Sequence, residues 1–359
     1  MVNQYATEKC DIMIIGAGPA GSTFARLIDS AKYKVVLVDG QTDKNSKPCG
    51  GLLAPDAQKI LAEFDLSLPK DVLVDPQIFS VKTIDAHTGK IRYYPRFYMN
   101  MDRFSFDKWL LSLVPREVDV VNGKCTQINA CGECFNVIVN TNMGKVNYVC
   151  KAVVGADGAN SMVRRTFFPS YKTKSYVAIQ QWFATDEMNP FYSCIFDSKT
   201  SPSCSWSIVK DSYFIFGGAF EACKCRENFE KQKKRMESFG FTFSEPIKTE
   251  ACMVLRPTLK SGFCLGGGGV YLIGEAAGFI SPSSFEGISS AIKSGTVLSE
   301  AINKSGLRAH KGYKHKTLHM RLRLLLKCIK HYFMYTPFFR KIIMNTGIQS
   351  IELKKQIHK

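Results

Sequence analysis

The sequence predicts an α/β protein with a discontinuous Rossmann-type domain, a second domain on a mostly antiparallel β-sheet, and a helical C-terminal region. Three observations support this fold class. A strand–turn–helix–strand unit opens the chain between Asp11 and Asp39, and two further strand–turn segments follow around Gly155 and Gly274. Runs of alternating apolar and polar residues fill the intervals between these segments.

The first unit is a complete dinucleotide-binding motif. Gly16, Gly18 and Gly21 supply the pattern G-x-G-x-x-G after an apolar strand, and a second strand over residues 34–38 ends at Asp39. Gly16 permits the tight turn, Gly18 lets the backbone approach a pyrophosphate, and Gly21 allows the helix to pack on the strand. The diphosphate then sits at the helix N-terminus, and Asp39 is placed to accept hydrogen bonds from a ribose. A glycine-rich turn without a ligand is the alternative.

Two later segments complete the same domain. Residues 151–154 form a strand that runs into a turn at Gly155, Asp157 and Gly158. The other segment contains a strand over 270–273, then Gly274 and Glu275, a loop with Pro282, and a helix that starts near Glu286 or Gly287. Both have the strand–turn form that presents backbone N–H groups to a ligand. Because the three segments lie far apart in the chain, the domain must be discontinuous.

The intervening residues predict the second sheet. Residues 77–98 alternate around turns at 87–90, and residues 176–220 alternate over a longer stretch, while helices are expected over 104–113 and 226–239. Such a sheet would form one wall of a substrate cavity. The expected division is a cofactor domain over 1–75, 101–170 and 250–305, a substrate domain over 76–100 and 171–249, and a basic helical region over 306–359.

Charge is concentrated near the C-terminus. The formal charge is +17, and 14 Lys or Arg residues face a single acid, Glu352, between Lys304 and Lys359. The stretch RLRLLLKCIKHYFMYTPFFRKIIM predicts one or two amphipathic helices broken at Pro337, with no apolar run of the ~20 residues that span a bilayer. Such a surface fits peripheral contact with anionic lipid or an acidic protein, or a helix packed on the body with a solvated basic face. No nucleic-acid motif accompanies the charge, so nucleic acid is not expected as a partner.

The 13 cysteines do not indicate a disulfide framework, because they are scattered over core-like segments of a long chain. A reducing, cytoplasmic setting is expected, either free or peripheral to the inner face of the membrane. Cys131 and Cys134 form a C-x-x-C motif that is interpreted as a hairpin turn. Only Cys223 and Cys225 suggest themselves as further zinc ligands, at an unsuitable spacing, so no metal is expected.

Together these segments resemble FAD-dependent oxidoreductases of the glutathione-reductase-like class, specifically the geranylgeranyl reductase family and its CbrA-like bacterial members. The resemblance covers about Cys10 to Ile302 and rests on GAGPAG, on KPCGG at Lys47 to Gly51, on GADGANSMVRR, and on GEAAGFISPSSFEG. The motifs other than KPCGG are shared with flavin monooxygenases, whereas KPCGG favours the reductases. The resemblance implies FAD as the cofactor.

The resemblance also implies roles for individual residues. The fingerprint would bind the ADP half of FAD and Asp39 its ribose; Asp157 and Gly158 would support the cofactor, with Ser161 and Arg164 holding the turn and helix behind them. The acid of the late motif would contact the ribityl chain or diphosphate, but here it is Glu275 where many relatives have Asp. The implied cofactor-binding residues are Gly16, Gly18, Pro19, Ala20, Gly21, Asp39, Lys47, Pro48, Gly50, Gly51, Arg103, Asp157, Gly158, Gly274, Glu275, Gly287 and Ile288. For Arg103, a surface charge at a helix start is the alternative.

Cys49 is the candidate catalytic residue, because the family places its KPCGG loop beside the flavin ring. Reduction of an unactivated alkene needs a hydride on one carbon and a proton on the other, and a thiol with pKa near 8.5 can supply the proton. A small buried thiol beside Gly50 and Gly51 is the structural alternative. The family's Y-x-W-x-F-P pattern is reduced here to Trp206, a candidate for lining the substrate cavity or for the core.

The function expected from the resemblance is FAD-dependent reduction of a carbon–carbon double bond in a hydrophobic, isoprenoid-like substrate. The alternatives are a flavin monooxygenase or dehydrogenase acting on an aromatic or polycyclic compound, and a non-catalytic flavoprotein at the membrane surface. No second G-x-G-x-x-G unit exists, since LGGGG at Leu265 to Gly269 leads into a strand. The electron donor is therefore expected to dock transiently, either as NAD(P)H or as a reduced acidic carrier protein attracted by the basic region.

Overall fold

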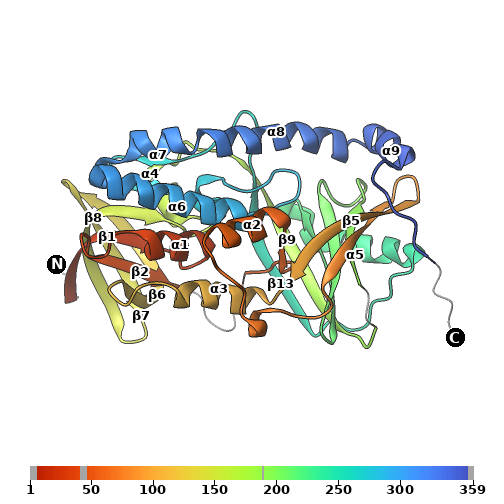
Figure 1. Ribbon diagram of the computed structural model, residues 1–359, viewed down its shortest axis with the longest axis horizontal. Coiled ribbons are helices and arrows are strands. Elements are labelled where there is room, and N and C mark those ends of the chain that lie inside the picture. The colour runs from red at the N-terminus through yellow and green to blue at the C-terminus, as the bar shows by residue number, and fades with distance from the viewer. Residues whose placement is uncertain (1–5, 41–46, 188–189, 355–359) are drawn as a thin grey trace. The chain divides into compact units, whose positions relative to one another are not determined.

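A computed structural model describes residues 6–40, 47–187 and 190–354, and the chain divides into two compact units (Figure 1). Unit 1 draws on Met1–Ser46, Phe104–Lys174 and Leu255–Lys327. Unit 2 draws on Lys47–Arg103, Ser175–Val254 and Cys328–Lys359.

This division differs from the sequence-based domain bounds at two places. Residues 47–75 fall in unit 2, because strand β3 (Leu52–Leu53) pairs antiparallel with strand β5 (Lys90–Asn100). The C-terminal region does not form a separate body, because the division falls within helix α8 (Leu318–Tyr335).

A seven-stranded sheet in the order β1-β2-β6-β7-β8-β15-β14, with an added β1–β8 pairing, forms the centre of unit 1. Strand β1 is parallel to β2 and β8, β2 is parallel to β6, and β8 is parallel to β15, while β7 is antiparallel to β6 and β8. The strands are β1 (Ala6–Ile15), β2 (Val35–Asp39), β6 (Asp119–Cys131), β7 (Cys134–Thr141), β8 (Gly144–Gly155), β14 (Gly266–Gly267) and β15 (Val270–Leu272). Val, Ile and Leu dominate β2, β15 and the second half of β1, as expected of parallel strands covered on both faces.

Helices cover this sheet, and two of them approach each other closely. In α6 (Ile288–Ser305), Gly295 lies so near α1 (Pro19–Leu27) that a Cβ there would be 2.6 Å from the carbonyl oxygen of Ala20. In α7, the fully buried Tyr313 donates its hydroxyl to the carbonyl of Leu272 at 2.9 Å. The helices of unit 1 are α1 (Pro19–Leu27), α3 (Arg103–Ser112), α4 (Met162–Phe167), α6 (Ile288–Ser305), α7 (His310–Lys316) and the first part of α8.

An eight-stranded sheet in the order β13-β9-β12-β11-β10-β4-β5-β3 forms unit 2. The pairs β3–β5, β4–β5, β10–β11, β11–β12 and β9–β12 are antiparallel and β4–β10 is parallel, so the expected mostly antiparallel sheet is present. Its remaining strands are β4 (Ile78–Asp85), β9 (Lys174–Ala184), β10 (Phe191–Phe196), β11 (Cys204–Lys210), β12 (Tyr213–Phe220) and β13 (Lys248–Arg256). Helices α2 (Pro55–Glu63), α5 (Cys225–Met236) and α9 (Pro337–Thr346) complete the unit.

The two faces of this sheet carry different clusters, because successive side chains on a strand alternate between faces. Phe216 and Phe220 of β12 pack with Phe229 of α5 on one face. The other face carries an apolar cluster that includes Ile208 and Ile215.

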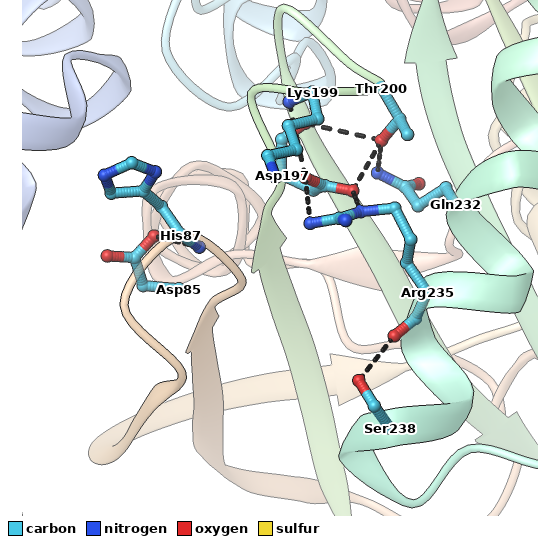
Figure 2. Close-up of polar contacts among 8 residues, drawn as sticks. All are labelled: Asp85, His87, Asp197, Lys199, Thr200, Gln232, Arg235 and Ser238. Atoms are coloured by element: carbon cyan, nitrogen blue, oxygen red, sulfur yellow. Dashed lines mark hydrogen bonds and ion pairs between the residues drawn. The ribbon is translucent and has the colours of Figure 1, made fainter.

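A polar network fastens α5 to the loop after β10. Figure 2 shows the buried carboxylate of Asp197 accepting hydrogen bonds from Arg235 at 2.7 and 3.1 Å and from the Thr200 hydroxyl at 2.8 Å. Gln232 of the same helix donates to Thr200 at 2.9 Å. Since a buried carboxylate needs several donors, these bonds fix the position of α5.

The C-terminal helices end in a buried ion pair within unit 2. Arg340 of α9 donates to Asp85 at 3.0 and 2.8 Å through Nε and Nη2, and both side chains are almost inaccessible to solvent. The predicted break at Pro337 is confirmed, because Pro337 starts α9. Lys355 and Lys359 of the basic region lie outside the described residues.

Other elements agree with the sequence-based expectations. Cys131 and Cys134 form the last cross-strand pair of the β6–β7 hairpin, so the hairpin interpretation is confirmed. All 13 cysteines are free thiols. Gly266 and Gly267 form β14, a strand antiparallel to β15, and do not start a helix.

Candidate functional site

The turn between β1 and α1 has the geometry that the glycine motif predicts. Gly16 has φ of +107°, a region that other residues adopt only with strain. A Cβ on Gly21 would lie 1.9 Å from the Gly16 carbonyl oxygen, so only glycine allows this helix to pack on the turn. Around Gly18 no protein atom lies within 4 Å of a Cβ position, so its backbone is open to a ligand.

The start of α1 presents its N–H groups without a side-chain cap. Gly18 is the N-cap residue and offers no side-chain hydrogen bond, and Pro19 occupies the first turn, where its missing N–H costs nothing. Ala20 and Gly21 follow as buried residues of this turn. Uncapped N–H groups and the positive end of the helix dipole favour an anion such as a diphosphate.

Asp39 lies at the end of β2 with its side chain almost fully buried, at 2% exposure. Lys108 of α3 donates to its carboxylate at 2.9 Å. This partner was not recognised from the sequence; the signal for it is the single lysine of the helix R-F-S-F-D-K-W-L-L. The pair holds the carboxylate in place at the strand end.

The G-A-D-G segment turns sharply after β8 and leads into α4. Asp157 accepts hydrogen bonds from the N–H groups of Met162 at 2.7 Å and Val163 at 3.3 Å. Ser161 caps α4 by accepting from the N–H of Arg164 at 3.0 Å. Gly158 has φ of +72°, so this turn also requires glycine.

Arg164 and Asp157 have different polar environments. Arg164 donates to the carbonyls of Ala276, at 2.8 Å, and of Ala159, and so ties the G-A-D-G turn to the late motif. Asp157 Oδ1 is buried and accepts no hydrogen bond from the residues that the structure describes. Burial raises the pKa of the Asp157 carboxyl, with Ser161 and the N–H groups of Val163 and Met162 acting in the opposite direction.

The late motif forms a 3₁₀ turn (Gly274–Ala277) and then α6. Glu275 is buried and accepts a hydrogen bond from the N–H of Leu255 at 2.9 Å, so its longer side chain fastens the end of β13. Gly287 is the N-cap of α6 and has no side-chain cap, and Ile288 is the first helical residue. The predicted helix start is therefore confirmed.

These turns meet at one edge of the unit 1 sheet. Gly16 donates its N–H to the Val38 carbonyl at 3.0 Å, Ala156 donates to Ile15 at 2.9 Å, and Ile273 donates to Gly155 at 3.0 Å. The carboxyl ends of β1, β2, β8 and β15 are thus adjacent, because all four strands are parallel. The predicted residues Gly16, Gly18, Asp39, Asp157 and Gly274 all follow these ends, where α/β sheets bind ligands.

Unit 2 contains the KPCGG loop. Gly51 donates its N–H to Cys49 Sγ at 3.4 Å, and its φ is +61°. Half-buried Pro48 precedes the cysteine, and its carbonyl is 3.9 Å from the thiol of Cys252. Lys47 begins this described segment and is also half-buried.

Lys210 is a functional candidate that sequence reasoning missed. Its side chain is buried, and Nζ donates to the Gly51 carbonyl at 3.1 Å, to Asn100 Oδ1 at 2.6 Å, and to the Met101 carbonyl at 2.6 Å. All three ammonium protons are therefore used. A Cβ on Gly51 would lie 2.4 Å from Nζ, so the position of the Lys210 ammonium requires glycine at residue 51.

The environment of Lys210 lowers its pKa. Burial lowers the pKa to about 8, while the nearby Cys49, Asp102 and Asp211 act to raise it. The signal in the sequence is a lysine at the end of the apolar strand C-S-W-S-I-V-K, at the spacing that puts it on the face of Trp206 and Ile208.

Trp206 lies against this loop. A Cβ on Gly50 would be 3.7 Å from the indole, and a Cβ on Gly217 would be 2.6 Å from it, so the ring packs closely against Gly217. The indole Nε1 is buried without a hydrogen-bond partner among the described residues. The structure therefore brings Trp206 and the KPCGG loop together within unit 2. Arg103, the first residue of α3, is half-buried and belongs to the same unit.

Two negative findings concern the described residues. No group of three or more His, Cys, Asp or Glu side chains there is arranged to hold a metal ion. None of the helices in those ranges combines the length and apolar character needed to cross a bilayer.

Comparisons with solved structures agree with this architecture. A geranylgeranyl bacteriochlorophyll reductase-like protein from Thermoplasma acidophilum aligns with a TM-score of 0.80 at 17% identity, covering 98% of this chain and 94% of that one. The probable FAD-dependent monooxygenase PqsL from Pseudomonas aeruginosa aligns at 0.68 and 15% identity, covering 95% and 100%. The fold is thus that of the FAD-dependent oxidoreductases, as expected.

Sequence comparison gives a nearer relative. The chain matches no protein-family model. Protein CbrA from Escherichia coli K12 is 44% identical over 349 residues, which are 96% of this chain and 98% of that protein. Identity of this extent over nearly the whole of both chains shows that this protein belongs to the CbrA family.

Proposed function

We propose that unit 1 binds FAD and that the protein is a flavin-dependent oxidoreductase. The observation that carries the proposal is the open backbone at Gly18, next to an uncapped helix N-terminus and framed by Gly16 and Gly21, which cannot carry a side chain. This combination fits a diphosphate that contacts the backbone directly. The FAD-dependent proteins that share the fold support this cofactor.

The remaining contacts are assigned by residue chemistry. The turn at Gly16–Gly21 would hold the diphosphate and Asp39 the adenosine ribose. Asp157 Oδ1 is a buried acceptor without a donor among the described residues, so it suits a cofactor hydroxyl. The uncapped start of α6 would face the negative charge of the reduced ring.

We propose that the reaction is reduction of a carbon–carbon double bond in a hydrophobic, isoprenoid-like substrate. When bound, FAD supplies a hydride from its reduced ring to one carbon of the double bond. The Cys49 thiol donates its proton to the other carbon, and the thiolate is reprotonated from water. Lys210 and Gly51 hold the loop that presents this thiol.

The reductant must dock transiently. NAD(P)H, or a reduced acidic electron-carrier protein, would supply the two electrons that each turnover consumes. The basic C-terminal region would speed the encounter with an acidic carrier at low salt. Replacing the exposed residues Arg308, Lys311 and Lys314 by Gln should then slow reduction by such a carrier but not by NAD(P)H.

A monooxygenase or dehydrogenase of aromatic compounds is the second candidate. The fold shared with PqsL favours it, as does the replacement of the reductase pattern around Trp206 by Cys204, Ile208 and Val209. This reaction consumes oxygen or an external acceptor and needs no proton from Cys49.

One experiment separates these functions. Purified protein is examined for bound flavin by its absorbance, reduced without oxygen, and then given a polyprenyl lipid or oxygen. We expect rapid reoxidation by the lipid, and we expect Cys49→Ser to slow it by roughly 100-fold or more without weakening FAD binding. The exposed thiol variant Cys131→Ser serves as the control.

The other outcomes are equally informative. Oxygen-dependent product formation that survives Cys49→Ser would support the monooxygenase. Bound FAD with no turnover would support a flavoprotein that acts by binding. Failure to bind FAD would refute the assignment of unit 1.

A further inference from the structure

The C-terminal helices expose an unusual amount of apolar surface. Twelve of the 20 large hydrophobic side chains that are exposed in the described part of the chain lie between Leu318 and Leu353. The remaining eight are scattered over residues 79–259. Isolated exposed apolar residues are ordinary, but a concentration of this kind marks a contact surface.

On α8 the exposed residues form one stripe. Leu318, Leu322, Leu326, Ile329 and Phe333 are 42% to 64% exposed. Their spacing of four, four, three and four residues keeps them on one side of the helix, and Tyr332, 62% exposed, widens the stripe to about 120°. We call these six residues the α8 stripe.

The opposite side of α8 is already used for packing. Met320 and Leu324 are buried in the core of unit 1. In unit 2, the hydroxyl oxygen of Tyr335, at the end of the helix, accepts a hydrogen bond from the N–H of Cys204 at 3.1 Å. The α8 stripe therefore does not hold the helix on the protein. If α8 served only to pack on the rest of the protein, its exposed side would carry polar residues in place of this stripe.

Apolar exposure continues into α9. Phe338 is 65% exposed, and Ile342 and Ile343 are 49% and 39% exposed. Phe339 contacts Phe333 of α8 with ring centroids 4.9 Å apart, so the end of α8 and the start of α9 share one aromatic group within unit 2. Aromatic side chains with one wet edge are favoured at the boundary of a bilayer.

Positive charge flanks this surface. Arg323 and Lys330 are exposed on α8, about 60° and about 40° of rotation beyond the edge of the stripe at Leu326, and Lys341 is exposed on α9. The only acidic residue from Lys304 onward is Glu352. An apolar stripe bordered by Lys and Arg is the pattern of a helix that lies in the headgroup layer of an anionic membrane.

We propose that the α8 stripe and the exposed apolar side chains of α9 dock on the surface of a bilayer that contains anionic lipid. The apolar side chains enter the headgroup–acyl boundary, and Arg323, Lys330 and Lys341 contact lipid phosphates. No described helix is long and apolar enough to span the bilayer, so the helices lie on it. This contact is independent of FAD, and it would give unit 2 access to substrates dissolved in lipid.

The test is co-sedimentation of the full-length protein with vesicles of phosphatidylcholine alone or with about 30% phosphatidylglycerol. We expect binding to the anionic vesicles that falls as salt is raised. The variant Leu322→Gln/Leu326→Gln/Ile329→Gln should bind at least about tenfold more weakly. Replacing Arg323, Lys330 and Lys341 by Gln should weaken binding by roughly fivefold for each charge.

A matched control removes equal apolar surface elsewhere. Met143→Gln/Ile247→Gln/Leu259→Gln changes three exposed side chains outside the C-terminal helices and should leave vesicle binding unchanged. Because all the substituted side chains are exposed, circular dichroism and the melting temperature should match the parent protein. If either measurement changes, vesicle binding is measured instead for Leu322→Gln, Leu326→Gln and Ile329→Gln singly, and full retention of binding by all three would count against the proposal.

Three outcomes would overturn the proposal. The first is equal, negligible binding to both vesicle types. The second is binding that the apolar variant retains in full. The third is a concentration-dependent dimer, lost in the apolar variant, with no vesicle binding, which would assign the surface to a second copy of the chain. Bound flavin, measured in the same samples, reports separately on the proposed function.

Discussion

The glycine motif allows the cofactor assignment to be separated from the stability of the fold. In Gly18→Ala the new methyl group meets no protein atom within 4 Å, and the backbone at φ −71°, ψ −174° suits any residue. We therefore expect the unfolding free energy without cofactor to change by no more than about 0.5–1 kcal/mol. The methyl group would, however, occupy the space through which a diphosphate approaches the backbone.

The expected loss of FAD affinity follows from that position. If the displaced diphosphate loses one charge-assisted hydrogen bond, worth about 1.5–3 kcal/mol, the Kd rises roughly 10- to 150-fold. In Gly21→Ala the methyl group would lie 1.9 Å from the Gly16 carbonyl oxygen, so backbone must move by more than about 1 Å. Overpacking of that kind costs about 1–3 kcal/mol or more, so this variant should lose stability as well as FAD.

The assay combines two measurements on each variant. Urea unfolding of the cofactor-free protein gives stability, and quenching of FAD fluorescence on titration gives Kd. Gly267→Ala is the control, because its methyl group also meets no atom within 4 Å but lies away from the turn. A Kd for Gly18→Ala equal to that of the control would refute direct contact between this backbone and the diphosphate. Destabilisation as large as that of Gly21→Ala would refute the steric argument.

Three further predictions concern unit 2. Burial lowers the pKa of Lys210 from 10.5 to about 8. Between about pH 8 and 10.5, Lys210 is therefore protonated in the unfolded chain but not in the folded chain. The unfolding free energy should then rise with increasing pH, by up to about 1.4 kcal/mol per pH unit. This rise should disappear in Lys210→Met, measured by urea unfolding at pH 7, 8 and 9; parallel profiles would contradict it. Gly51→Ala, whose methyl group would lie 2.4 Å from the Lys210 ammonium, should change the rate of Cys49 alkylation measured by peptide mass mapping, whereas Gly50→Ala, with 3.7 Å to its nearest neighbour, should not. Arg340→Met should lower the unfolding free energy by about 3–5 kcal/mol by leaving the Asp85 carboxylate buried without its cation, and a loss below about 1 kcal/mol would show that water reaches this pair.

Local patterns sufficed for the elements of unit 1. The turn at Gly16–Gly21 and the turn after β8 are determined by residues close together in sequence. Each of these strand–turn patterns can therefore be recognised from its own segment of the chain. The alternating runs also predicted β4, β5 and the strands from β9 to β12 of unit 2, because alternation indicates that one face of a strand is buried, but they did not predict β3 or β13. The division of the chain could not be predicted from local patterns, because residues 47–75 join unit 2 through long-range contacts, such as the pairing of Leu52 and Leu53 with a strand almost 50 residues later and the hydrogen bond from Lys210 to Gly51.

The candidate site shows the same contrast. The motif residues were identified from the sequence, but their partners were not: Lys108 beside Asp39, and Leu255 beside Glu275, come from segments that carry no motif. Lys210 was missed because a strand-end lysine is ordinarily solvated. Its importance appears only when Gly51, Asn100 and Met101 supply three acceptors around it.

The amino-acid sequence by itself determined the fold class, the dinucleotide motif and the basic amphipathic character of the C-terminal helices. These properties depend on spacing and composition, which are local. Only the tertiary structure decided which side of α8 packs on the body and which side remains exposed, and which groups pair with the motif residues. Burial and pairing join residues that are distant in the chain, so the physical environment of a side chain is a property of the folded molecule.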